Sequence, residues 1–297
     1  DRAERATRDI VSRAMFTEMR RGNTTNSGGL YFTMRHLPPD EVRKNFKGMV
    51  ERCEDYGFDL VGGLVEVVPT AHYMMGGVIF GADCQTGLSG LFAAGEDTGG
   101  VHGANRLGGN GVANSTVFGG VAGDSIAAWV AGVEGLRDAD EDAIDAAVAF
   151  CRAPLDRPPG DLEAVRERLY ELMWEDVGII RDGESLDRAV AAFDDLEREL
   201  DGIGVAGDTA AYNLTWHDWL NLKNLILVSR SITAAAIARE NSRGAHYRAD
   251  FPDAGDLEAS AFTRVRLEAG AMTVDTEPVA FTRIKPGETL LGEDAAE

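Results

Sequence analysis

Residues 102–111 read HGANRLGGNG and lie in a block rich in glycine, since ten of the 35 glycines of the chain fall within residues 95–123. Glycine lets the backbone approach a ligand closely, so this density predicts a functional loop. His72, His102 and Arg106 lie in or near the block. A guanidinium, protonated imidazoles and glycine amides all donate hydrogen bonds, which predicts a site for a small anion such as a carboxylate. The pattern leaves one alternative open, a set of tight turns with incidental polar residues.

The segments before and within this block predict a chain of mixed α+β class. On the N-terminal side the pattern predicts two amphipathic helices, at residues 6–21 and 38–57, and two short extended segments, at residues 29–34 and 64–68. Residues 69–123 contain short apolar pieces separated by glycine, which predict strands and loops. A helix is expected to open near Val112.

Beyond residue 123 the pattern becomes helical, and an alternating tail follows. Helices are expected at residues 125–135, 140–151, 161–180, 184–200 and 216–241. A break rich in proline, at residues 154–160, separates the first two from three long amphipathic helices, whose spacing predicts an antiparallel bundle. Residues 262–291 alternate between apolar and polar side chains and predict a small β-hairpin.

Charge and composition exclude several classes of partner and site. The 297 residues carry a formal net charge of −21, which disfavours binding to nucleic acid or anionic lipid. Residues 134–201 alone hold 21 acidic and 8 basic residues, so a small anionic ligand elsewhere remains compatible with the charge. No apolar run approaches the roughly 20 residues that cross a bilayer, so we expect no direct membrane insertion. Cys53, Cys84 and Cys151 have no CxxC or Cys/His spacing, which predicts no metal site and a reducing, cytoplasmic compartment.

The usual nucleotide-binding and hydrolase motifs are absent from the sequence. The nearest approach to GxGxxG is GNGVAN at residues 109–114, which lacks the third glycine and follows no clear strand. No P-loop, GxSxG or HExxH string occurs either. Motifs alone therefore predict no dinucleotide site of the usual kind.

Several strings together resemble one known family. PTAHYMMGG at 69–77, GLFAAGE at 90–96 and HGANRLGGN at 102–110 are similar to the C-terminal half of the succinate dehydrogenase/fumarate reductase flavoprotein family, which includes L-aspartate oxidase. RENSRGAHYR at 239–248 resembles the signature that ends the helical domain of that family. The resemblance implies four parts: a remainder of a capping domain at 1–68, the returning part of a FAD-binding domain at 69–123, a helical domain at 124–252 and a β tail at 253–297.

The resemblance also implies roles for individual residues. Arg8 matches the catalytic arginine that moves a proton at the substrate carbon. His72 and Arg106 match the residues that bind the two ends of a dicarboxylate. The residues that match contacts to FAD are Glu96, at a ribityl or ribose hydroxyl, and the loop residues Asn110, Gly111 and Val112, at the flavin ring. Gly111 departs from the family, in which a serine is common at this position.

The implied function is interconversion of succinate and fumarate, or of a related dicarboxylate, by hydride transfer to or from flavin. The alternatives are a flavoprotein that desaturates another carboxylate, an L-aspartate oxidase, and a docking subunit that binds a partner through Trp216, Trp219 and residues 220–228. The N-terminal Rossmann half of the family is absent from the sequence. We therefore expect this chain to be inactive alone, and to work with a second chain that supplies that half and with an electron-transfer subunit.

Overall fold

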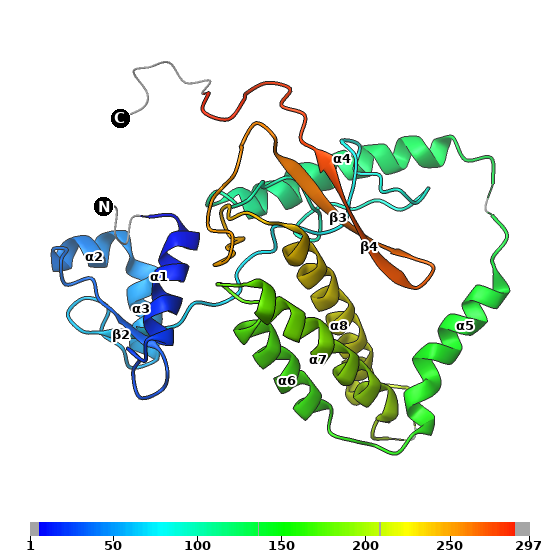
Figure 1. Cartoon of the computed structure of the whole chain (residues 1–297), viewed down its shortest axis with the longest axis horizontal. Helices are drawn as coiled ribbons and strands as arrows, with labels where there is room; N and C mark the ends of the chain where they lie inside the picture. Colours follow the sequence, from blue (N-terminus) through cyan, green and yellow to red (C-terminus); the bar gives the residue numbers. More distant parts are fainter. Residues whose placement is uncertain (1–5, 136, 208, 289–297) are drawn as a thin grey trace. The chain divides into compact units, whose positions relative to one another are not determined.

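The computed structural model describes residues 6–135, 137–207 and 209–288 (Figure 1). The chain divides into two compact units, residues 1–72 and 73–297, and each is described by itself. Both units contain helices and an antiparallel pair of strands, which confirms the mixed helix and sheet class. No described helix is both long enough and apolar enough to span a membrane.

The first unit contains three helices, one pair of strands and a small core. Its elements are α1 (Arg8–Arg20), β1 (Leu30–Phe32), α2 (Pro39–Asn45), α3 (Lys47–Asp55) and β2 (Val65–Val67). β1 and β2 pair antiparallel, and Val42 and Val50 are buried in the core beside them. The helix expected from residue 38 to residue 57 is in fact two helices, because Phe46 leaves the helical conformation with φ −123°.

The strands expected in residues 69–109 are not present as such, which corrects the prediction for this block. The segment makes only isolated bridges, such as Val78 to Thr98 and Gln85 to Phe92. Glycines with positive φ, among them Gly77 and Gly95, turn the chain before a longer ladder can form. The result is an irregular loop region that brings residues distant in sequence together.

One long helix, α4 (Asn110–Ala131), begins inside the HGANRLGGNG stretch. α4 includes both the helix start expected near Val112 and the separate helix expected at 125–135, because it continues through residue 123. Gly109 precedes it in the left-handed conformation, with φ +83°. Of the residues of α4, Asn114 and Ala122 are buried within this chain.

The remaining helices are α5 (Glu141–Arg152), the short 3-10 helix η2 (Ala153–Asp156), α6 (Leu162–Glu175), α7 (Gly183–Gly202) and α8 (Leu214–Ala238). The last three lie side by side and share the largest core of the chain (Figure 1). α5 to α8 each begin after an Asp or Asn whose side chain accepts a backbone N–H, which stabilises these helix starts. Trp219 is 1% exposed in this core, so of the proposed docking stripe mainly Leu225, Leu227 and Val228 face solvent.

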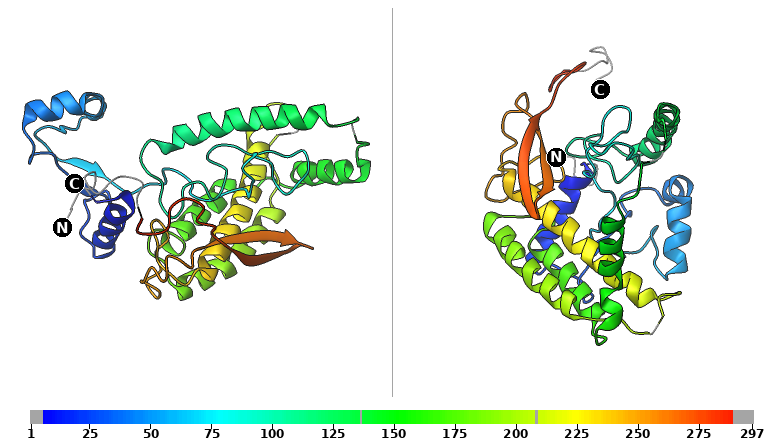
Figure 2. Two further views of the ribbon diagram at one scale, coloured as in Figure 1. Left: turned by 90° about the horizontal axis from the view of Figure 1, so that it is seen from above. Right: turned by 90° about the vertical axis from the view of Figure 1, so that its right-hand side faces the viewer.

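A hairpin of β3 (Ala261–Glu268) and β4 (Ala271–Pro278) follows the helices and packs against α8 (Figure 2). Val265 lies opposite Val274 in the ladder. Arg264 of β3 donates to Asp275 of β4 at 2.6 Å and also pairs with Glu277. These cross-strand ion pairs support the register of the hairpin.

Candidate functional site

Arg106 lies in the loop before α4 and has few partners for its own charge. Its guanidinium carbon is 4.4 Å from the ring centroid of Tyr73, a cation–π distance. Its Nη1 donates to the carbonyl oxygen of Leu107 at 3.1 Å, and its backbone N–H lies 3.0 Å from the Met75 sulfur. The Nε atom is buried and has no hydrogen-bond partner among the described residues. A buried guanidinium N–H without an acceptor is costly, so this geometry fits an anionic ligand.

Tyr73, His102 and Asn114 form a polar cluster beside Arg106. The Asn114 Nδ2 donates to the Gly95 carbonyl at 3.0 Å and lies 3.2 Å from the Tyr73 hydroxyl and 3.3 Å from His102 Nε2. His102 Nε2 also lies 3.3 Å from the Tyr73 hydroxyl, and the two rings meet edge to face. Burial, and then the charge of Arg106, lower the pKa of His102. The lowered pKa favours the neutral imidazole, which donates through one ring nitrogen.

The N-terminus of α4 carries no acidic side chain that would compete with an anionic ligand. No side chain caps it, and its first turn contains no Asp or Glu. The Asn110 N–H donates to the Leu107 carbonyl at 3.3 Å, whereas the positive end of the helix dipole and the N–H groups that follow remain available to an anion. Nearby, a Cβ at Gly111 would lie 2.7 Å from Tyr73 Cε2. The Tyr73 ring thus fills the space that a serine would need, which gives a physical reason for glycine at this position.

The residues predicted to contact FAD lie around the same loop. Glu96 is exposed, and its Oε1 accepts the backbone N–H of Met74 at 3.0 Å. Asn110 and Val112 are exposed on the first turn of α4, and Gly111 is half-buried there. The second unit therefore brings together Arg106, the Tyr73 cluster and the first turn of α4.

Arg8 and His72 belong to the first unit. Arg8 is the exposed first residue of α1, and His72 is the exposed last residue of that unit. Their roles remain predictions.

Two members of the polar cluster were missed by the sequence reasoning. Tyr73 directly follows His72 in the PTAHYMMGG string, and Asn114 comes four residues after Asn110. Since residues four apart share a helix face, the spacing of Asn114 could have indicated it once α4 was assigned. No local signal indicates that Tyr73 and Asn114 meet, because the two residues are 41 positions apart in the sequence.

A second polar cluster lies in the RENSRGAHYR stretch. Arg248 is 4% exposed; its Nε and Nη2 donate to the two carboxylate oxygens of Asp250, and its Nη1 donates to the Ala236 carbonyl at 2.9 Å. The Arg248 guanidinium lowers the pKa of Asp250 to about 2. The nitrogens of His246 contact Arg181 Nη1 and the Arg239 carbonyl, each at 3.1 Å. Burial, and then the nearby Arg181, lower the pKa of His246 to about 4.

We predict that the stability of the chain falls as the pH drops from about 6.5 to about 4, because of His246. In this window the unfolded chain binds a proton on His246 and the folded chain does not, so protonation favours unfolding. The full contribution is present above pH 6.5 and is lost on acidification. We expect about 2 kcal/mol, less than the full pKa shift would give because the ring is only partly buried. Denaturant unfolding across this range measures it.

The variant His246→Asn removes the titrating group and should flatten this slope. An exposed histidine offers the matched control, since His36→Asn should keep the slope of the parent chain. A parent chain as stable at pH 4.5 as at pH 7 would contradict the prediction.

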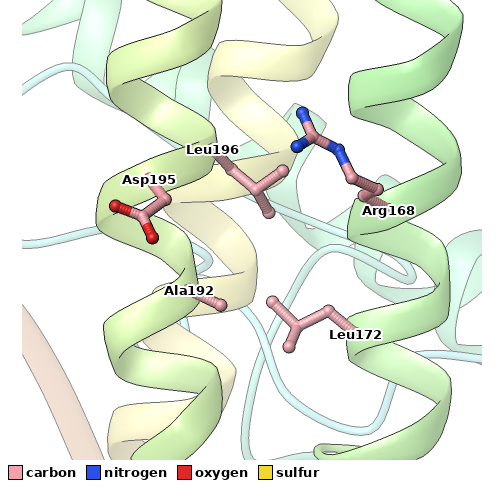
Figure 3. Close-up of a pocket in the computed structure, with 5 residues that line it drawn as sticks. All are labelled: Arg168, Leu172, Ala192, Asp195 and Leu196. Carbon is pink, nitrogen blue, oxygen red and sulfur yellow. The ribbon is translucent and has the colours of Figure 1, made fainter.

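A pocket of about 220 Å³ lies between α6 and α7 (Figure 3). The side chains that line it are Arg168, Leu172, Ala192, Asp195 and Leu196. Both charged side chains have partners: Arg168 pairs with Glu199, and Asp195 accepts from Arg198 at 2.9 Å. With an apolar floor and no free polar group, this pocket offers no catalytic chemistry. In the part of the chain that the structure describes, no cluster of His, Cys, Asp and Glu could hold a metal ion.

Two family models and several known proteins match this chain. A family model described as "FAD binding domain" matches residues 1–112, and one described as "Fumarate reductase flavoprotein C-term" matches residues 166–290. An uncharacterized FAD-dependent oxidoreductase of Methanocaldococcus jannaschii is 40% identical, and a fumarate reductase (CoM/CoB) subunit of Methanothermobacter marburgensis is 39% identical. Each alignment covers 85% of this chain and 46% of the relative. L-aspartate oxidases are 29% to 33% identical.

Solved structures show the same likeness. A chain of the quinol fumarate reductase of E. coli matches with a TM-score of 0.86 and 29% identity, over 96% of this chain and 50% of that chain. The chain therefore spans about half the length of the relatives and structures that it matches.

Proposed function

We propose that this chain, which belongs to the succinate dehydrogenase/fumarate reductase flavoprotein family, supplies the carboxylate-binding half of a FAD-dependent dicarboxylate oxidoreductase. The observation that carries the proposal is the Arg106 guanidinium, which lies over Tyr73 with a buried Nε that has no partner in the described residues. Its planar fork matches a carboxylate. The match to a FAD-binding domain supports FAD as the cofactor.

The residues of the second unit fit a flavin cofactor. The first turn of α4, which no side chain caps, offers backbone N–H groups at Gly111 and Val112 beside the Asn110 side chain, and the exposed Glu96 offers a carboxylate to a sugar hydroxyl. The chemistry that bound FAD would supply is hydride exchange with one carbon of the dicarboxylate. These residues of the chain would hold and orient it.

The chain's own side chains would bind the substrate and move its proton. Arg106 and His72 would each bind one carboxylate, which fixes the orientation of the carbon chain and stabilises negative charge that develops beside it. Arg8 would give a proton to, or take it from, the carbon next to the one that exchanges the hydride. Because a guanidinium holds its proton tightly, neighbouring groups would have to relay the proton to and from Arg8.

Two alternative activities fit the same site. The site would also bind a different carboxylate substrate, and L-aspartate oxidases are among the relatives of this chain. Fumarate reductase is favoured because the relative so named, from Methanothermobacter marburgensis, is 39% identical, against 33% for the L-aspartate oxidase of Yersinia pestis.

We also propose that the chain divides into four parts, with boundaries at residues 68, 123 and 252. We propose a cytoplasmic location, with peripheral membrane association through partner subunits.

The exposed surface of α4 supports a need for further protein. Val112, Val117 and Val130 are 77%, 59% and 57% exposed on this helix. Apolar side chains repeated along one exposed helix mark a surface that another chain segment covers. We propose that a FAD-binding half, on a second chain or in the rest of a longer one, covers α4 and completes the flavin site. An electron-transfer subunit would be the further partner.

Mixing this chain with a separately produced N-terminal half from a relative tests the proposal. We expect the purified chain alone to be colourless and inactive, and the mixture to retain flavin absorbance through gel filtration and to reduce fumarate or oxidise succinate. The docking alternative predicts a complex without flavin or turnover. A yellow, active lone chain would disprove the need for a second half.

A further inference from the structure

The loop that carries Arg106 is in direct backbone contact with the RENSRGAHYR stretch. The Ala245 N–H donates to the Ala104 carbonyl oxygen at 2.9 Å, two residues before Arg106. Gly244 has φ +54°, and a Cβ built there would overlap the Ala104 carbonyl and lie 2.9 Å from Asn105 Cβ. Residue 244 therefore has to be glycine for the two loops to meet at this distance.

A tight turn holds Gly244 and Ala245 in place. The Arg243 N–H donates to the His246 carbonyl at 2.8 Å, and the His246 N–H donates back to the Arg243 carbonyl at 3.0 Å. The His246 ring is itself fixed between the Arg239 carbonyl and the Arg181 guanidinium. The imidazole of His246 thus helps to hold the turn, together with the Arg243 side chain, which donates to Ser260 Oγ and to the carbonyls of Ala254 and Asp256.

Arg181 connects this turn to the helical core. Its backbone N–H and carbonyl pair with Tyr247 and Ala249, and its Nε donates to the Gly178 carbonyl at 2.9 Å. Its Nη1 faces His246 Nδ1, which accepts only while the imidazole is neutral. Arg181 is therefore engaged on several sides and serves as a support of the turn.

The backbone of the loop sets the orientation of the Arg106 side chain, because the guanidinium makes few contacts of its own. Among the described residues, its guanidinium makes one hydrogen bond, to the neighbouring Leu107 carbonyl, and it stacks on Tyr73. A displacement of the Ala104 carbonyl would move Arg106 relative to that ring. A misplacement of about 1 Å at a binding group costs up to about 100-fold in rate.

We propose that Arg181 and His246 are positioning residues for Arg106, acting through the Gly244–Ala245 turn on the Ala104 carbonyl. The proposal rests on the proposed function of Arg106 as a carboxylate-binding group. Arg181 and His246 themselves touch no substrate. They hold the loop so that the Arg106 fork faces one carboxylate of the dicarboxylate.

Gly244→Ala tests the proposal, with Gly255→Ala as the matched control. Both glycines have positive φ, but the nearest atom to a Cβ at 255 is Arg243 Nη2 at 3.7 Å. Gly255→Ala thus carries the same backbone strain without displacing the Ala104 loop. We expect Gly244→Ala to weaken succinate binding about 10- to 100-fold, in the chain and in its assembly with the FAD-binding half, and Gly255→Ala to change it less than twofold.

Two readouts separate positioning from general stability. The NMR signal of the Arg106 Nε–H should shift in Gly244→Ala and in His246→Ala, and succinate affinity should fall in both. His246→Asn, whose side-chain oxygen can accept from Arg181 in place of Nδ1, should restore affinity and raise KM little. If Gly244→Ala does not fold, the two His246 variants decide the question.

The outcomes also distinguish this proposal from the proposed function. If Arg106→Ala abolishes succinate binding but the Gly244 and His246 variants bind like the parent chain, positioning is wrong and the carboxylate site stands. If Arg106→Ala itself leaves binding unchanged, the proposed function fails and the positioning proposal fails with it.

Discussion

Replacing Arg106 by alanine is expected to abolish turnover of succinate and fumarate in the flavin-loaded assembly. The Nε of this guanidinium is buried and has no partner within the described residues, and the site would lose its bidentate contact to a carboxylate. Removing one partner of such a desolvated charge pair costs about 2–5 kcal/mol, or roughly 30- to 5,000-fold in affinity. Steady-state kinetics and succinate titration measure the loss.

Two further variants make this result specific. Arg106→Lys keeps the charge but loses the planar fork, so it should recover only part of the activity. Arg137→Ala removes an equal charge from an exposed arginine of the same unit, whose Nη2 lies 3.4 Å from Ser89 Oγ, and should change kcat/KM less than twofold. Association with the partner half should survive in all three variants. Unchanged turnover in Arg106→Ala would refute the assignment.

Replacing Arg248 by methionine should produce the largest loss of stability in the second unit. The substitution leaves Asp250 without its bidentate partner and removes the donors to the Ala236 and Ile237 carbonyls. Breaking a buried ion pair costs about 3–5 kcal/mol, and we expect the lower end because the Asp250 side chain is 34% exposed. Denaturant unfolding monitored by tryptophan fluorescence reports on this unit, because all four tryptophans of the chain belong to it.

An exposed pair provides the matched control for Arg248. Arg198 and Asp195 are three residues apart on α7 with side chains 74% and 75% exposed, so Arg198→Met should cost at most about 1 kcal/mol. The pH dependence adds a second check. The Asp250 carboxylate stabilises the parent chain above pH 3.8, and this contribution is lost as the pH falls through about 2, whereas Arg248→Met should lack it. Equal unfolding midpoints for Arg248→Met and Arg198→Met would contradict the prediction.

Local patterns predicted the helices well, and the loop region poorly. Apolar spacing alone indicated α5 to α8. The structure adds that Asp140, Asp161, Asp182 and Asn213 accept backbone N–H groups at the first turns of these helices. The prediction of strands in residues 69–109 was wrong. An apolar piece such as GGVIF does not show whether the glycine turns around it will allow a second strand to pair with it. Because of the same glycines, the start of α4 was expected near Val112, whereas the helix begins at Asn110.

Short strings carry two features that need no structure: the residue types that gather in the HGANRLGGNG block and the family to which the chain belongs. Folding is needed to show that Arg106 lies over Tyr73, that Asn114 connects Gly95 to His102, and that Ala245 supports the loop through Ala104. These contacts join residues 12 to 141 positions apart. Local propensity carries no information about pairs so distant, since they form only when packing brings their loops together.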